Sequence, residues 1–148
     1  MKIHFLLFTV AIVFAALFAS NASAQYAFYP MAPCRVVDTR YFTGVDGAPN
    51  LEDNTRRDFQ IRGLCGVPLT AKAVVLNVTV TNASTGSWVT IWPSDQTMPD
   101  VSTINFDQTT TAIANGMIVG LGTATLDLAV QNAIGKVHLI IDVNGYYQ

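Results

Sequence analysis

Charged and metal-binding side chains are scarce in this sequence, and their scarcity excludes several function classes. The chain of 148 residues has 8 Lys and Arg against 10 Asp and Glu, which gives a net charge of −2. We therefore expect no binding of nucleic acid, because that requires a basic surface. The chain has 2 cysteines and 2 histidines, and His4 lies in the apolar N-terminal segment that is expected to be removed. The three remaining ligands are one fewer than a structural zinc site usually needs.

The first residues are typical of a secretory signal peptide. Lys2 precedes a mostly apolar stretch over 3–18, and the small residues Ala-Ser-Ala follow at 22–24. Cleavage is expected before Gln25, so residues 1–24 are the predicted signal peptide. The apolar stretch is shorter than the roughly 20 residues of a membrane-spanning helix, and no second such run follows. We expect a secreted protein, extracellular or at the cell surface, with no transmembrane segment after signal removal.

Helical periodicity is missing after residue 25, and short segments with β-branched residues in alternation take its place. The predicted strands are 34–39, 57–62, 71–81, 87–92, 102–106, 112–121, 125–131 and 136–146. About eight short strands at this spacing predict an all-β, two-sheet sandwich or jelly roll, with a small β-barrel as the alternative. Residues 34–148 form the predicted single domain. Residues 25–33 are an apolar N-terminal tail, because Pro30 and Pro33 oppose a long regular strand.

Alternation also predicts which side chains form the core. One strand should bury Val74, Leu76, Val78 and Val80, and the last should bury Val137, Leu139, Ile141 and Val143. In the first strand Val36 and Val37 take opposite faces, so only one of them should point into the core.

Cys34 and Cys65 are an even pair of cysteines in a chain that is expected to be secreted, which predicts a disulfide. Closing a loop of this length would stabilise the fold by about 3 to 4 kcal/mol. The segment PCRVVDTR at 33–40 therefore favours a covalent staple over a catalytic cluster.

Catalytic arrangements find little support in the sequence. His138 and Asp142 share a strand face but stand about 13 Å apart, too far for a catalytic dyad. The G-x-S-x-G elbow of many hydrolases is missing. We predict that the protein is not an enzyme; a hydrolase using loop carboxylates such as Asp95, Asp100 and Asp107 is the least favoured alternative.

The loop DGAPNLED at 46–53 has the oxygen ligands that suit calcium in an extracellular protein. It lacks the spacing of an EF-hand, and a turn-forming loop is the simpler interpretation. No cofactor and no metal site are predicted, with calcium left open at this loop.

Both tryptophans of the chain lie in the segment SWVTIWPS at 87–94. Alternation places Val89 and Ile91 in the core and turns Trp88, Thr90 and Trp92 outward. Two tryptophans on one face would form a flat platform that stacks on sugar rings, so these three residues are the candidate ligand site. The alternative is that a loop or the N-terminal segment covers them.

Five segments in order resemble a β-rich module common in secreted and cell-surface bacterial proteins. They are PCRVVDTR at 33–40, CGVPLTAKAVVLNVTVT at 65–81, WVTIWPSDQTMPDVSTINF at 88–106, AIANGMIVGLG at 112–122 and HLIIDVNGYY at 138–147. Such modules occur alone after a signal peptide, in tandem, or appended to other extracellular domains. The resemblance implies a β-rich fold and an extracellular location, and it transfers no active site.

Asn77, Asp142 and Asn144 of these segments fall on outward strand faces, and the charged residues Arg35, Asp38 and Arg40 lie in PCRVVDTR. If the first and last strands pair, these residues could form one cluster that fixes strand register or, if left open, binds a ligand.

The resemblance favours a non-catalytic binding or adhesion module, because appended β-domains usually supply attachment. A glycan or another surface protein is the expected partner. The alternative is a self-assembling structural subunit of a surface layer or filament, a homo-oligomer joined through the apolar tail and edge strands.

Overall fold

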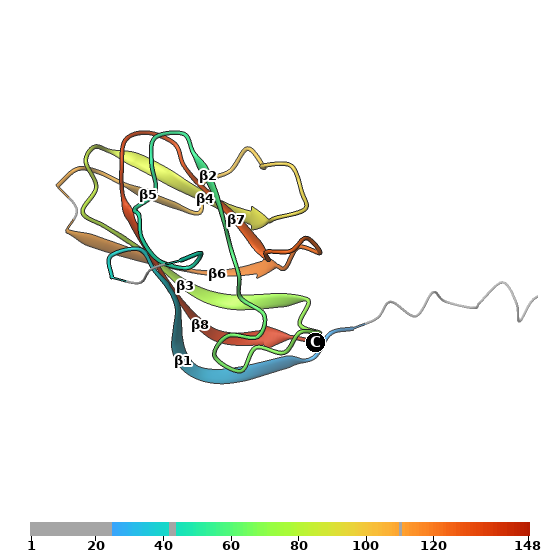
Figure 1. The fold of residues 1–148 in the computed structure, drawn as a ribbon. Helices are drawn as coiled ribbons and strands as arrows, with labels where there is room; N and C mark the ends of the chain where they lie inside the picture. The colour runs from blue at the N-terminus through green and yellow to red at the C-terminus, as the bar shows by residue number, and fades with distance from the viewer. Residues whose placement is uncertain (1–24, 42–43, 110) are drawn as a thin grey trace, which may run out of the picture.

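Eight β-strands and no helix make up the part of the chain that the computed structural model describes, residues 25–41, 44–109 and 111–148 (Figure 1). The predicted signal peptide lies outside these residues. The strands are β1 (Phe28–Asp38), β2 (Arg56–Phe59), β3 (Ala73–Thr81), β4 (Ser87–Pro93), β5 (Ile104–Phe106), β6 (Ala112–Gly120), β7 (Leu128–Asn132) and β8 (His138–Tyr147). Within the described ranges no helix is long and apolar enough to cross a membrane.

The strands form two antiparallel sheets of four, in the orders β1-β8-β3-β6 and β2-β7-β4-β5. The pairs β1 with β8, β2 with β7, β3 with β6 and β4 with β5 are nested. This nesting of eight strands in two sheets is the order of a jelly roll. Over the described residues the sheets do not close into a barrel, so the predicted sandwich is confirmed.

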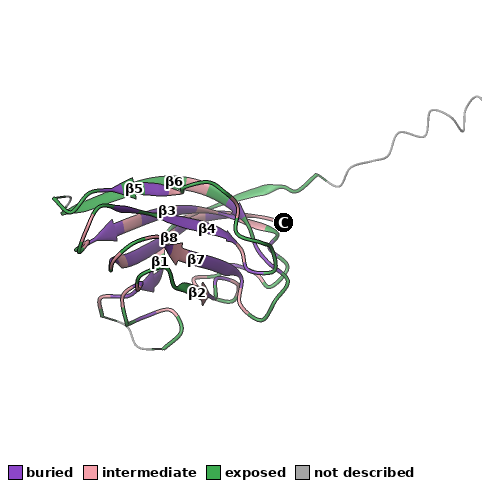
Figure 2. Cartoon of the chain, turned by 90° about the horizontal axis from the view of Figure 1, so that it is seen from above, coloured by how far each residue is buried: buried purple, intermediate pink, exposed green. Residues whose placement is uncertain are grey.

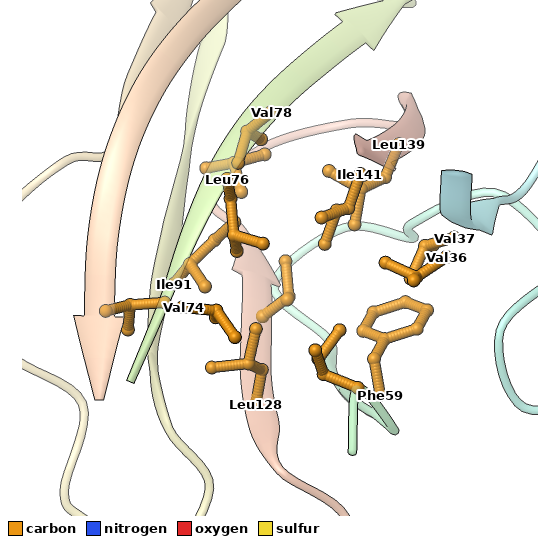
Figure 3. Packing of buried hydrophobic residues seen from close by; sticks show 14 of the residues in the cluster. Val36, Val37, Phe59, Val74, Leu76, Val78, Ile91, Leu128, Leu139 and Ile141 are labelled. Carbon is orange, nitrogen blue, oxygen red and sulfur yellow. The ribbon is translucent and has the colours of Figure 1, made fainter. Parts of the chain in front are cut away.

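The core lies between the sheets, where the buried side chains of both inner faces meet (Figures 2 and 3). The alternating pattern is confirmed on β3, but on β8 Ile140, which alternation turns outward, is also buried. All eight side chains predicted to be buried there are at most 1% exposed: Val74, Leu76, Val78, Val80, Val137, Leu139, Ile141 and Val143. Phe59, Ile91 and Leu128 of the other sheet pack against them.

The structure corrects the prediction that residues 25–33 form a tail outside regular structure. β1 begins at Phe28 and runs through Pro30 and Pro33, paired with β8. Two physical features permit this: β1 is an edge strand, so a proline need not donate to a second neighbour, and the register shifts between Pro30 and Cys34.

A second register shift corrects the prediction for Val36 and Val37. The shift lies between Arg35 and Val37 in the pairing with β8. Both valines are consequently buried, although simple alternation would turn one of them outward.

Gly145 on β8 marks a close approach between β8 and the start of β1. A Cβ atom there would lie 2.5 Å from Cε2 of Phe28 and 2.8 Å from the carbonyl oxygen of Tyr29. Gly145→Ala should therefore lower the free energy of unfolding by roughly 1 to 3 kcal/mol through overpacking. Gly116→Ala is the matched control, because its Cβ would meet only the Leu76 oxygen at 4.0 Å. Equal unfolding midpoints in urea for the two variants would contradict this packing argument.

Candidate functional site

The three residues of the candidate ligand site lie on β4, but only one of them is exposed. Trp88 is 43% exposed, whereas Trp92 is 3% exposed and Thr90 is also buried. The prediction that both tryptophans form an open platform is therefore wrong. The alternative, in which a loop covers part of this face, holds for Trp92.

The segment after β4 folds back over its outer face and accounts for the burial of Trp92 and Thr90. The indole N–H of Trp92 donates to the Gln96 carbonyl oxygen at 3.0 Å, and the Thr90 hydroxyl donates to the Val101 carbonyl oxygen at 2.8 Å. The Arg56 guanidinium lies 5.6 Å from the centre of the Trp92 indole. These contacts come from the loop after β4 and from Arg56 of β2, so alternation along β4 could not indicate them.

Trp88 stands between two hollows on the outer side of the β2-β7-β4-β5 sheet. One has a volume of about 500 Å³ and the other about 350 Å³, and Trp88, Thr90 and Met98 line both. The larger one is completed by Asp53, Asn54, Gln131, Ala133 and Ile134. The smaller one is completed by Pro99, Asp100, Val101, Ser102 and Asn105.

Hydrogen bonds hold several polar side chains of these hollows in place. In the larger hollow the Gln131 amide donates to Asn54 Oδ1 at 2.6 Å, and Asp53 Oδ1 accepts from the Gly135 N–H at 2.7 Å. In the smaller one the Asn105 amide donates to Ser102 Oγ at 3.0 Å. Among the described residues, neither lining includes a lysine or an arginine. The surface therefore offers an aromatic ring beside amide, hydroxyl and carboxylate groups.

The first and last strands do pair, and this brings most of the predicted polar cluster together. Arg35 faces Asp142 in the register of β1 and β8, and its Nε donates to Asp142 Oδ1 at 2.8 Å. Asp38 is buried and accepts from Arg35 Nη1 at 3.3 Å and from Arg40 Nη2 at 2.8 Å. The Arg35–Asp142 pair ties β1 to β8 at paired positions, and the Asp38 pairs join residues of β1 and the turn after it.

The two asparagines of the predicted cluster lie beside its ion pairs. Asn77 is opposite Asp142 across β3 and β8, and its amide donates to Thr79 Oγ1 at 3.4 Å. Asn144 lies in the register shift of β8, between Val143 and Gly145. In this geometry the side chains of Arg35, Asp38, Arg40 and Asp142 form a junction of ion pairs, and the two asparagines flank it.

Asp38 gives this junction a dependence on pH. The Arg40 side chain donates to the Asp38 carboxylate and holds the pKa of that carboxyl below its usual value. A carboxyl whose pKa is lowered by folding stabilises the fold above its unfolded pKa, about 3.9, and this contribution is lost as the pH falls through the folded pKa. Asp38→Asn should destabilise the protein near pH 7, and its difference from wild type should shrink below about pH 4. Urea unfolding at the two pH values measures this, and a difference that does not change with pH would contradict it.

The remaining candidates for chemistry are held in structural contacts. His138 Nδ1 lies 3.2 Å from the Thr39 hydroxyl, and Asp95 accepts from the hydroxyl of Thr123 at 2.7 Å. In the 46–53 loop, Asp46 accepts from the Gln60 N–H at 3.0 Å, and burial raises the pKa of Asp46. The described residues contain no group of three or more His, Cys, Asp or Glu side chains placed to hold a metal ion.

Sequence reasoning missed the buried ion pair of Arg62 and Asp127. Asp127 follows β6 in the chain, yet its carboxylate accepts from the backbone N–H groups of Ile61 and Arg62 at 2.6 and 2.7 Å and from the Arg62 guanidinium. The two residues are 65 positions apart. No local pattern marks them as partners, because only the jelly-roll topology brings them together.

The predicted disulfide joins Cys34 on β1 to Cys65 in the loop before β3, with 6.0 Å between the two Cα atoms. It lies on the β1 side of the molecule and lines neither hollow beside Trp88. The disulfide and the ion pairs are therefore structural, and the Trp88 surface is the candidate binding site. Comparison with known proteins finds no matching family model and no similar curated protein.

Proposed function

We propose that the protein is a secreted, non-catalytic module that binds neutral carbohydrate around Trp88, at the cell surface or in its surroundings. The observation that supports this most is the position of Trp88, which is 43% exposed and stands between two hollows. An indole ring offers a flat apolar surface for the C–H face of a sugar ring. The amides and hydroxyls beside it suit the hydroxyl groups at the sugar's edge.

The size of the surface favours a ligand of more than one sugar ring. Each hollow falls within the range of about 300–1,000 Å³ that is common for small-molecule sites. Because Trp88 lines both hollows, a chain stacked on the indole could place neighbouring rings in each.

The charge of the surface favours an uncharged ligand. Asp53 lines one hollow and Asp100 the other, and no cationic side chain is among the described lining residues. A uronic or sialic acid would bring its carboxylate toward the carboxylates of Asp53 and Asp100, with no lysine or arginine in the described lining to offset the repulsion. Neutral glycans are therefore preferred.

A glycan array that holds neutral and acidic sugars tests this proposal on wild type, Trp88→Ala and Tyr41→Ala. Wild type should bind neutral glycans. Trp88→Ala should weaken binding about tenfold or more, because it removes both the apolar area of the indole buried by the sugar and a stacking contact of roughly 1 kcal/mol. Tyr41 is an exposed aromatic residue that lines neither hollow, so Tyr41→Ala should bind as wild type does. Absence of binding by wild type, or equal binding by all three proteins, would reject the proposal.

Trp92 is left unchanged in this test because it is buried and hydrogen-bonded to Gln96. Its replacement by alanine would remove packing beneath the loop at 94–103 and would confuse loss of fold with loss of binding.

A further inference from the structure

Four strands lie at sheet edges in this fold, and three of them have features that discourage pairing with another chain. β1 contains Pro30 and Pro33 and two register shifts, β2 is four residues long with Arg56, Arg57 and Asp58, and β5 has three residues. Prolines, bulges, charges and short length are the devices by which natural proteins protect edges.

The fourth edge strand, β6, has none of these devices. Its nine residues, AIANGMIVG, include no charge and no proline. Its register with β3 is continuous from Ala112 to Gly120, without a bulge. On its two faces Ile118 is 63% exposed and Ile113 is 38% exposed. A long, regular, uncharged and mostly apolar edge strand is the type that pairs with another strand.

We propose that β6 pairs antiparallel with β6 of a second copy, about a two-fold axis at Gly116. The two β1-β8-β3-β6 sheets would then join into one continuous sheet with no free β6 edge. This assembly does not depend on carbohydrate binding, because Trp88 and both hollows belong to the other sheet.

The sequence of β6 fits a second copy of itself. Antiparallel pairing about Gly116 places Ile118 beside Ala114 on the outer face, so a large side chain meets a small one, and places Ile113 beside Val119 on the inner face. Because β6 carries no charge, the two copies approach without like-charge repulsion. This register pairs all nine residues, and a shift by two would leave residues unpaired at both ends.

Sedimentation equilibrium of the purified protein, expressed from the full sequence, tests the assembly from micromolar to millimolar concentration. Wild type should be a reversible dimer, and Ile118→Lys should raise the dimer dissociation constant about tenfold or more, because an edge lysine opposes pairing. Leu69→Lys is the control, since Leu69 is exposed in a loop and should leave the dimer unchanged. A monomeric wild type, or a dimer that resists Ile118→Lys, would overturn the proposal.

Oxidative cross-linking tests the register separately. Gly116→Cys should form an intermolecular disulfide, because position 116 faces itself across the axis and a side chain there has room beside Leu76. Ala114→Cys should not cross-link, because its opposite residue is Ile118 of the second copy. Circular dichroism confirms that each variant is folded. Cross-linking of Ala114→Cys but not Gly116→Cys would overturn the two-fold axis at Gly116.

Discussion

Replacement of Asp127 with alanine is expected to lower the free energy of unfolding by about 3 to 5 kcal/mol, the cost of breaking a buried ion pair. Asp127 is buried and accepts hydrogen bonds from two backbone N–H groups, of Ile61 and Arg62, and from the Arg62 side chain. Its removal leaves the Arg62 charge without this partner and two N–H groups without this acceptor. The loss is a large part of the stability of a typical domain.

Urea unfolding of wild type, Asp127→Ala and Asp58→Ala measures this effect. Asp58 pairs with Arg56 at 2.6 Å, and their side chains are 29% and 41% exposed, against 5% for that of Asp127. An exposed pair contributes up to about 1 kcal/mol, so Asp58→Ala is the matched control. Asp127→Asn keeps one acceptor oxygen and should fall between the two, which provides a value even if Asp127→Ala does not fold. Equal losses for Asp58→Ala and Asp127→Ala would contradict the structural role of the buried pair.

Removal of the Cys34–Cys65 disulfide is the second large effect. The cysteines are separated by 31 positions, and the chain-entropy model assigns about 3 to 4 kcal/mol to a closed loop of that length. The variant Cys34→Ala, Cys65→Ala should lose this amount in urea unfolding without a reductant. A loss below about 1 kcal/mol would show that the disulfide adds little to the folded state.

The backbone at Cys65 supplies an internal check on this prediction. Its φ angle is 53°, in the left-handed region that glycine adopts more readily than other residues. The variant Cys34→Ala, Cys65→Gly should therefore be more stable than Cys34→Ala, Cys65→Ala by about 1 kcal/mol. An alanine variant that is equally stable would mean that the loop changes conformation once the disulfide is lost.

Most of the fold could be predicted because β-strands with one buried face have a simple period. Val74 to Val80 on β3 alternate without interruption, and burial follows that alternation. On β8 the alternation is interrupted at Ile140, which is buried between Leu139 and Ile141. The pattern fails where the backbone departs from the ideal strand. Val36 and Val37 are both buried because of a register shift, which depends on the pairing with β8 and has no local mark in the sequence.

The candidate site was harder to predict for the same physical reason. Alternation correctly placed Trp88 and Trp92 on the outer side of β4, but it could not show that the next loop returns to bury Trp92. The pairing of the first and last strands was a hypothesis that the structure confirms, and this pairing brings Arg35 to Asp142. The Arg62–Asp127 pair was missed, because its partners meet only through long-range topology.

The proposed carbohydrate site can be tested most directly through the fluorescence of Trp88. The chain has 2 tryptophans, so Trp92→Phe leaves Trp88 as the remaining indole. Titration of this variant with the neutral glycan that binds best on the array should change the emission of Trp88 in a saturable way, because stacking removes the ring from water. The Trp88→Phe variant should show no such change in the emission of buried Trp92. An emission from Trp88 that stays constant while calorimetry detects binding would place the ligand elsewhere and contradict the account.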